Sequence, residues 1–373
     1  MAIAEGIDVP AQPGTDALVA IIPGHRRDVA IEADVVEEIA RIRGYGSIPS
    51  ALPATAMPAY RPDPHRGVDT VRDLLSGCGL NEVVTNGLIG PTDHARLGLT
   101  ADDGETIRIG NPVAHDHAEL RRSLLPGLLR VLATNEHQRR DDLAVFEVGN
   151  VHRLVAGEPV ETAVLGILLA GDWLPAAWDR AGRAAEMADV IGLVEWLAAR
   201  LGVGRLERLA TEAWPGIEHP GRIAALRAVA SGLVVGRAGE LDPRYLAVAD
   251  VRAERVAVAL LELDALADSA QGGIRLSPIA RQPAVERDLA IVVDDERPAG
   301  EVEAAIREAG GPSLTEVALF DRYEGPPLAT GEVSLAYRLR LQADHTLTED
   351  EVDGLVAAVV ASLGSRLGAR LRS

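Results

Sequence analysis

Four carboxylates near the start of the chain are spaced in a way that could hold a cation. Asp34, Glu37 and Glu38 fall at i, i+3 and i+4, which places them on one side of a helix. Asp28 comes six residues before Asp34 and can fold back from the preceding loop. Oxygen ligands suit Mg²⁺, which usually takes one or two carboxylates and keeps its waters. A solvated acidic face, partly neutralised by Arg41, is the alternative interpretation of the same spacing.

A second candidate site lies near the other end of the chain, where apolar and polar residues alternate over residues 331–342. The alternation predicts a strand with one buried face, and it puts Arg338 and Arg340 on the open face. Arginine on such a face can contact phosphates or stack on bases. Residues 277–373 contain ten arginines and 17 acidic residues, a net charge of −7, so an RNA contact there must be small and local. An ion-paired arginine surface is the alternative.

His115, His117 and Glu119 could also suggest a metal site, because imidazole and carboxylate both bind zinc. Catalytic zinc sites on helices usually have the spacing H-E-x-x-H, whereas this His-x-His lies in what reads as a loop. A structural or exposed role is therefore favoured over a metal-dependent hydrolase. Cys78 reads as a small interior residue, since nothing near it in sequence would activate a thiolate.

Composition excludes several classes of protein. All 37 basic residues are arginine, so neither a phosphate-binding lysine nor a Schiff-base lysine is available. A single cysteine excludes an intrachain disulfide and a cysteine-built zinc site. The net charge of −19 argues against nonspecific binding to nucleic acid, DNA included. No apolar run approaches the ~20 residues of a membrane span, and the first residues are no signal peptide, so we expect a soluble, cytoplasmic protein.

Periodicity predicts three regions separated by linkers at residues 50–63 and 264–276. In the first, a strand at residues 19–23 precedes a helix that stops before Gly44. In the second, apolar spacing predicts helices at 64–77, from Glu119 to Leu132 with Pro126 starting or kinking it, and at 187–201. Strands are expected at residues 81–89, 143–151, 161–170, 217–242 and 255–263, and a loop at 173–183.

The last region alternates strands and helices in a recognisable order. Strands are predicted at 283–293, 315–323, 331–342 and 369–372, and helices at 298–310 and 348–367. The second helix begins with Thr348 followed by acids, a capping pattern. The order β-α-β-β-α-β is the ferredoxin-like split arrangement, in which both helices cover one face of the sheet and the other stays open.

Three groups of motifs, in family order, resemble the beta subunit of bacterial phenylalanyl-tRNA synthetases. The first group lies in residues 26–49 and contains the run IEADVVEEIAR followed by GY and IP. The second includes EVVT, NP, LRRSLLPGLL, FEVG, HPGR and GEL, between residues 82 and 241. The third consists of LFDRY, GEVSLAYRL and TLTEDEV, between residues 319 and 352.

The resemblance implies an α+β chain of three domains. These would be a B5-like domain at 1–58, truncated at its start, a class II synthetase-like antiparallel sheet with helices at 62–265 that keeps the fold without catalysis, and a ferredoxin-fold anticodon-binding domain at 277–373. The family's N-terminal tRNA-binding domain and its editing domain are not expected in this chain. His219, Arg222 and Glu240 would be fold or interface residues.

The resemblance also implies ligands and partners. Asp28, Asp34, Glu37 and Glu38 match the family's Mg²⁺ ligands, and Arg338 and Arg340 would bind tRNA(Phe). The helix at 64–77 and the strand after it resemble the class II dimerisation element, so we expect an alpha subunit and an (αβ)₂ heterotetramer. ATP would be a substrate at the alpha-subunit site, with no catalytic residue on this chain. A free-standing tRNA-binding or structural paralogue without ligase activity is the alternative.

Overall fold

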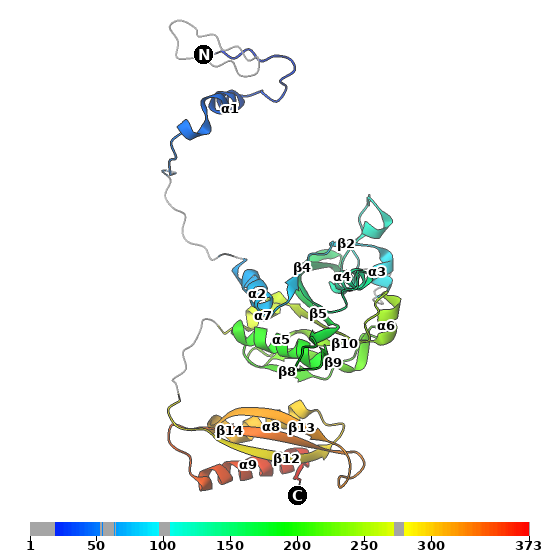
Figure 1. The fold of residues 1–373 in the computed structure, drawn as a ribbon, viewed down its shortest axis with the longest axis vertical. Coiled ribbons are helices and arrows are strands. Elements are labelled where there is room, and N and C mark those ends of the chain that lie inside the picture. Colours follow the sequence, from blue (N-terminus) through cyan, green and yellow to red (C-terminus); the bar gives the residue numbers. More distant parts are fainter. Residues whose placement is uncertain are drawn as a thin grey trace. The chain divides into compact units, whose positions relative to one another are not determined.

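The computed structural model describes residues 19–52, 54, 63, 65–96, 105–271 and 280–372. The chain divides into two compact units, residues 1–62 and 63–373 (Figure 1). Most of the predicted linker at 50–63 lies outside the described residues, as does the second half of the linker predicted at 264–276. The first half of that second linker is not a linker, because it forms helix α7, Leu263–Ser269.

The first unit is built around helix α1, Glu32–Arg43, which ends directly before Gly44 as predicted and is followed by a short 3₁₀ turn, Tyr45–Ser47. No residue of α1 is fully buried. Val29 is buried, and Ala20, Ile22 and Val35 pack against it. The strand predicted at 19–23 is reduced to a single bridge residue, Ile21.

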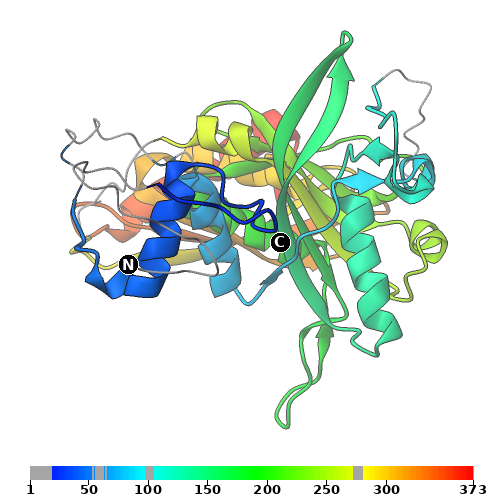
Figure 2. The same ribbon diagram turned by 90° about the horizontal axis from the view of Figure 1, so that it is seen from above.

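A seven-stranded sheet forms the centre of residues 63–271, in the order β1-β4-β5-β11-β10-β9-β8. Its long strands are β4, Leu143–Val155, and β5, Glu158–Ala170, whose hairpin extends beyond the rest of the sheet in Figure 2. The other strands are β1 (Asn81–Glu82), β11 (Val256–Glu262), β10 (Val234–Leu241), β9 (Glu218–Ala228) and β8 (Leu206–Leu209). Only β1 pairs in parallel, with β4; the remaining pairs are antiparallel.

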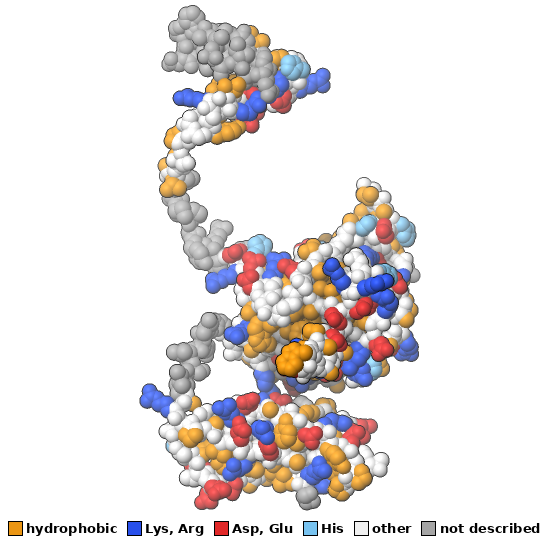
Figure 3. All heavy atoms as spheres, viewed as in Figure 1, with side chains coloured by type: hydrophobic (Ala, Val, Ile, Leu, Met, Phe, Trp, Pro, Cys, Tyr) orange, Lys and Arg blue, Asp and Glu red, His pale blue; other side chains and the backbone are white. Residues whose placement is uncertain are grey.

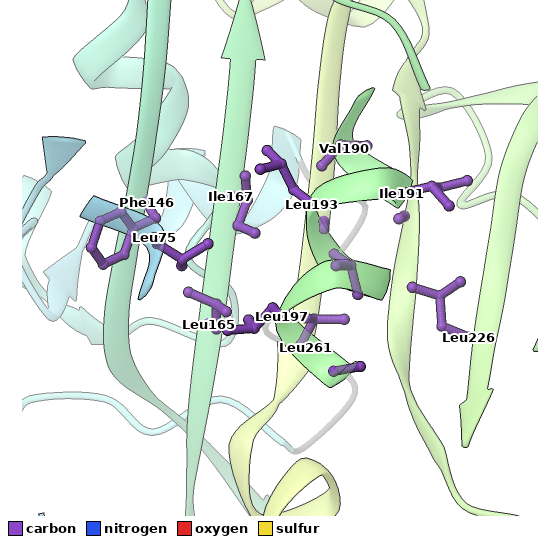
Figure 4. Packing of buried hydrophobic residues seen from close by; sticks show 14 of the residues in the cluster. Leu75, Phe146, Leu165, Ile167, Val190, Ile191, Leu193, Leu197, Leu226 and Leu261 are labelled. Atoms are coloured by element: carbon purple, nitrogen blue, oxygen red, sulfur yellow. The ribbon is translucent and has the colours of Figure 1, made fainter. Parts of the chain in front are cut away.

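Helices cover both faces of this sheet, and β5 shows how its side chains divide between them. Leu165, Ile167 and Leu169 pack with helix α5, Met187–Arg200, and helix α2, Arg66–Gly77 (Figure 4). Leu168 and Ala170 belong to the other core, which contains helix α4, Leu125–His137. Alternate residues of a strand point to opposite faces, so a strand buried on both sides reads as a continuous apolar run.

Several predicted elements of this region need correction. The helix expected from Glu119 begins only at Leu125, with Pro126 in its first turn, and Glu119–Leu120 is instead strand β3. The strand expected at 81–89 is divided into β1 and a separate strand β2, Leu88–Ile89, which pairs with β3. The loop expected at 173–183 is a hairpin of β6, Asp172–Leu174, and β7, Arg183–Ala184. Two further helices are short: α3, Pro91–Arg96, and α6, Pro243–Val248.

The C-terminal region has the predicted order β-α-β-β-α-β. Its elements are β12 (Val285–Asp294), α8 (Ala299–Gly310), β13 (Leu314–Tyr323), β14 (Glu332–Leu341), α9 (Glu349–Leu367) and β15 (Arg370–Leu371). The antiparallel sheet has the order β13-β14-β12-β15. Thr348 and Glu351 form the predicted capping box of α9. The ferredoxin-like fold and the α+β class are therefore confirmed.

One face of this sheet packs on its helices. Val333, Leu335, Tyr337, Leu339 and Leu341 are buried with residues of α8 and α9, as the alternation in β14 predicts. Tyr337 is fully buried, and its hydroxyl donates a hydrogen bond of 2.8 Å to the carbonyl oxygen of Ala299. Among the described helices, none is both long and apolar enough to cross a membrane.

Candidate functional site

Arg338 and Arg340 both lie exposed on β14, on the face that the helices leave open. Arg338 pairs with Asp288, its cross-strand neighbour on β12, through two hydrogen bonds of 2.8 Å, from Nε to Oδ1 and from Nη2 to Oδ2. The Arg338 hydrogen bonds lower the pKa of Asp288, so this carboxylate is ionised at neutral pH. Arg340 is held more loosely, with its Nη1 3.9 Å from Oε2 of Glu316 on β13.

Two aromatic rings complete this open face, and neither was predicted from the sequence as a site residue. The guanidinium of Arg338 lies over the Phe320 ring, 5.2 Å from its centroid, and that of Arg372 lies over the Tyr323 ring at 4.3 Å. Ala290 and Ala336 are paired across β12 and β14. Arginine planes and aromatic rings are the groups on which proteins stack single-stranded bases.

The sequence held a partial signal for these residues. Phe320 and Tyr323 stand in a predicted strand, but their approach to Arg338 and Arg372 depends on the pairing of β13 with β14, whose register shifts between Leu319 and Asp321. One residue expected on the open face, Ser334, is buried at 2% exposure. Figure 3 shows acidic and basic side chains interspersed on the visible surface of the C-terminal region, with no continuous basic patch.

The four acids predicted to bind magnesium are not arranged like the ligands of a metal ion. Asp34 accepts hydrogen bonds from the backbone N–H groups of Ala30, at 2.7 Å, and Ile31, at 2.9 Å, which lower its pKa and cap α1. Glu37 is exposed. The carboxylates of Asp28 and Glu38 both bind one guanidinium, that of Arg26.

Arg26 was not predicted as a member of this site. Its Nη2 lies 2.7 Å from Oδ2 of Asp28 and 2.5 Å from Oε1 of Glu38, and Arg41 binds the second oxygen of Glu38 at 2.7 Å. Hydrogen bonds from Arg26 lower the pKa of both carboxylates. In the part of the chain that the structure describes, no group of three or more His, Cys, Asp or Glu side chains could hold a metal ion. As arranged here the four acids do not fit a cation, which would have to displace Arg26, and the magnesium site stays a prediction.

The histidine-containing loop does not form the zinc site considered as an alternative. His115 and His117 lie in a short 3₁₀ turn, whereas Glu119 is buried and pairs with His94 of α3, Nδ1 to Oε2, at 2.7 Å. His94 Nε2 accepts a hydrogen bond from the backbone N–H of Arg122, so the proton of this ring lies on Nδ1. His94 is 25 residues from Glu119, and the sequence offered no signal for this pair.

The motif residues of the central region form a buried network. Arg121 is 8% exposed and binds Oε1 of Glu147 at 2.6 Å, and Glu147 in turn accepts from the hydroxyl of Thr85 at 2.7 Å. Two motif glycines make room for this network. A Cβ on Gly127 would lie 2.2 Å from Oγ1 of Thr85, and one on Gly149 would lie 2.3 Å from Nη2 of Arg121.

A second buried carboxylate, Glu240, ties together strands β9, β10 and β11. It accepts from Arg222 at 2.9 Å, from Arg255 at 2.6 Å and from the backbone N–H of Met187 at 3.0 Å. Burial raises the pKa of Glu240, but the hydrogen bonds from Arg255, Met187 and Arg222 outweigh it, and the net shift is downward. Arg222 and Glu240 therefore hold the fold, as expected from the motif; His219 is not part of this network.

A cavity of about 450 Å³ opens on the same sheet, between β4, β5, β9, β10 and β11. Two of the three arginines that line it, Arg122 and Arg237, are paired within the protein. Arg237 pairs with Glu218 at 2.7 Å and lies 4.7 Å over the ring of Trp214, and Arg122 pairs with Glu105 at 2.5 Å. Burial raises the pKa of Glu218.

Comparison with known families covers nearly the whole chain. Residues 48–265 match the phenylalanyl tRNA synthetase beta chain CLM domain, residues 280–372 the ferredoxin-fold anticodon binding domain, and residues 3–45 the tRNA synthetase B5 domain. A pyrrolysyl tRNA synthetase from Desulfitobacterium hafniense is 15% identical over 55% of this chain and 68% of that one, with a TM-score of 0.43, too low to support an argument.

Similar proteins carry the name phenylalanine--tRNA ligase beta subunit. That of Symbiobacterium thermophilum is 40% identical over 99% of this chain, and that of Moorella thermoacetica 39% over 94%. The protein from Listeria innocua is 34% identical over 96%. The chain spans 41% to 44% of the length of these relatives. The first family match alone covers more than half of the chain, which therefore belongs to the phenylalanyl-tRNA synthetase beta chain family.

Proposed function

We propose that this chain acts as the C-terminal portion of a phenylalanyl-tRNA synthetase beta subunit. In this role it would support the ATP-dependent attachment of phenylalanine to tRNA(Phe) by assembling with an alpha subunit and by binding tRNA. The open face of the C-terminal sheet carries the proposal, because it combines exposed arginines with aromatic rings on a domain of the anticodon-binding family. The buried networks around Glu147 and Glu240 give the central module a structural role, and the ATP site would lie on the alpha subunit.

RNA binding follows from the layout of that face. The two arginine–aromatic pairs offer planar groups on which a base can stack. Arg338 and Arg340 are each about half exposed and can reach phosphates. The interspersed acids keep the number of phosphates small. Binding by this chain alone is expected to be weak, and contacts elsewhere in the assembled enzyme would add to it.

Assembly with an alpha subunit, as an (αβ)₂ heterotetramer in the cytoplasm, is the second part of the proposal. Helix α2 and the strand that follows it resemble, in sequence, the dimerisation element of class II synthetases. The magnesium ligands would be Asp28, Asp34, Glu37 and Glu38, with Arg26 displaced.

Reconstitution with an alpha subunit of the family tests both parts. Light scattering should give the (αβ)₂ mass, and a chain that stays monomeric contradicts the assembly. The double variant R338Q/R340Q should raise the KM for tRNA roughly fivefold or more. It should also make the salt dependence shallower by about 0.7 to 0.9 per lost phosphate contact. Amino-acid activation should be unchanged.

The matched control for this double variant is R297Q/R366Q, which also removes two ion-paired arginines, with side chains 32% and 49% exposed. Arg297 pairs with Glu301 at 2.8 Å and Arg366 with Glu308 at 2.6 Å, on or beside the helices that cover the opposite face of the sheet. Its net charge change equals that of R338Q/R340Q, so general electrostatics would affect both alike. Equal KM values and salt slopes for the two double variants would contradict an RNA site on the open face.

A further inference from the structure

Arg338 is already bound, in this structure, by the kind of group it would meet on RNA. The two oxygens of Asp288 receive two parallel hydrogen bonds of 2.8 Å from its Nε and Nη2. A phosphate is recognised by arginine through the same two-pronged geometry. A phosphate can therefore reach this guanidinium in that geometry only after Asp288 has released it.

Two other arginines of this face also have carboxylate neighbours, but their geometries differ. Arg370 pairs with Glu332 at 2.7 Å, and Arg340 approaches Glu316 only to 3.9 Å. Arg338 combines a two-pronged pair with a position over the Phe320 ring. In this position the guanidinium lies over one face of the ring, and Phe320 remains 53% exposed.

We propose that Asp288 is an internal competitor for RNA on this face: it holds Arg338 over Phe320 until an RNA phosphate displaces the carboxylate. The inference rests on the proposed function and deepens it. Displacement frees the guanidinium of Arg338 for a phosphate, beside a Phe320 ring that is already accessible. Asp288 thus lowers the affinity of this face for tRNA and favours the release of bound tRNA.

The test is the binding of the full chain to a tRNA(Phe) transcript, measured by fluorescence anisotropy over a series of salt concentrations. Asp288→Asn keeps the shape of the side chain and removes its charge. Since an exposed ion pair contributes little, the expected gain is about two- to fivefold in affinity. The slope of log K against log salt should become steeper by about 0.7 to 0.9, the value of one more phosphate contact.

Glu316→Gln is the matched control. It also removes one carboxylate beside an arginine of β14, but Arg340 is 3.9 Å away and is not held by two hydrogen bonds. A general charge effect would give both variants the same gain, whereas displacement of Asp288 predicts a clearly larger gain for D288N. In the R338Q background, D288N should have no more effect than E316Q, because the group it releases is gone. Thermal melting of each variant excludes an effect of misfolding.

Three results would overturn the inference. A D288N gain equal to that of E316Q would show only general electrostatics, and weaker binding by D288N would mean that Asp288 itself contacts the RNA. A D288N gain that persists in the R338Q background would place the effect elsewhere. If R338Q/R340Q itself leaves tRNA binding unchanged, the proposed RNA face fails as well; if it weakens binding while D288N matches E316Q, only the competition fails.

Discussion

Arginine–carboxylate pairs have different roles in two regions of this chain. In the central module, the Arg121–Glu147 pair and the Glu240 cluster join segments that are distant in sequence. The carboxylates of Glu147 and Glu240 are 1% and 2% exposed. In the C-terminal sheet, Arg338 and its partner Asp288 are about half exposed. Arg255 binds both oxygens of Glu240, as Arg338 binds both oxygens of Asp288, so these two pairs differ mainly in their access to water.

That difference determines what can replace each partner. A buried carboxylate cannot be exchanged for a phosphate without opening the core, and an arginine left there alone would be an uncompensated buried charge. On the open sheet, water and salt already compete with Asp288, and the pair contributes little to stability. The motif arginines of the central module thus stabilise its fold, whereas the arginines of the C-terminal face remain available for a ligand.

The largest effect is expected from breaking the buried pair. Glu147→Ala leaves Arg121 without its carboxylate and removes the acceptor of the Thr85 hydroxyl. We expect a loss of about 3–5 kcal/mol in the stability of the central module, because the remaining charge is buried. Calorimetry of the full chain measures it, with Glu316→Ala as the exposed control, for which the loss should stay below about 1 kcal/mol. Equal losses would contradict the distinction between the two regions.

A pH series sharpens the comparison at Glu240. Its folded pKa lies below the unfolded value of about 4.3, so the carboxylate contributes stability that is fully present above that pH. This contribution is lost as the pH falls through the lowered folded pKa. Glu240→Gln should cost about 1–3 kcal/mol at pH 7 and should reduce the acid sensitivity of the central module. An acid-unfolding profile identical to that of the parent would mean that other carboxylates dominate.

Periodicity predicted the elements that bury one face, and it failed where contacts between distant segments decide the structure. The six elements of the C-terminal region were predicted to within a few residues, since capping at Thr348 and alternation in β14 are local signals. Residues 81–89 and 119–120 were misassigned, because two short strands pair there across the sequence. A strand of two residues is too short to show the alternation by which strands are predicted.

The candidate sites show the same limit. Arg338 and Arg340 could be placed on the open face from alternation alone. Asp288, Phe320 and Arg26 could not be found, because each enters its site through a cross-strand register or a loop that folds back on a helix. The sequence predicted the site residues that a local pattern places on one face. It did not predict the partners that contact them from other segments.

The first unit offers an intermediate case, in which a carboxylate binds backbone groups instead of arginine. Asp34→Ala removes the acceptor for the N–H groups of Ala30 and Ile31 and should cost about 1 kcal/mol, as for other helix caps. Hydrogen exchange at the first turn of α1 measures the effect. Glu32→Ala, also in that first turn, is the control, and an equal increase in exchange for both variants would argue against a capping role.

The effect of magnesium is expected to be of similar size. Its measurement asks whether the carboxylates that bind Arg26 can be released to a ligand, as Asp288 is proposed to release Arg338. If Mg²⁺ binds the acids of the first unit with a Kd near 1 mM, 10 mM should stabilise the unit by about 1.4 kcal/mol. Glu38→Gln should abolish this gain, whereas Glu32→Gln on the same helix should keep it. Arg26→Gln should increase the gain, because Asp28 and Glu38 are then released from its guanidinium. A parent chain whose melting and α1 hydrogen exchange are the same with and without Mg²⁺ would leave Arg26 as the lasting partner of these carboxylates, and the acidic face as a solvated, ion-paired surface.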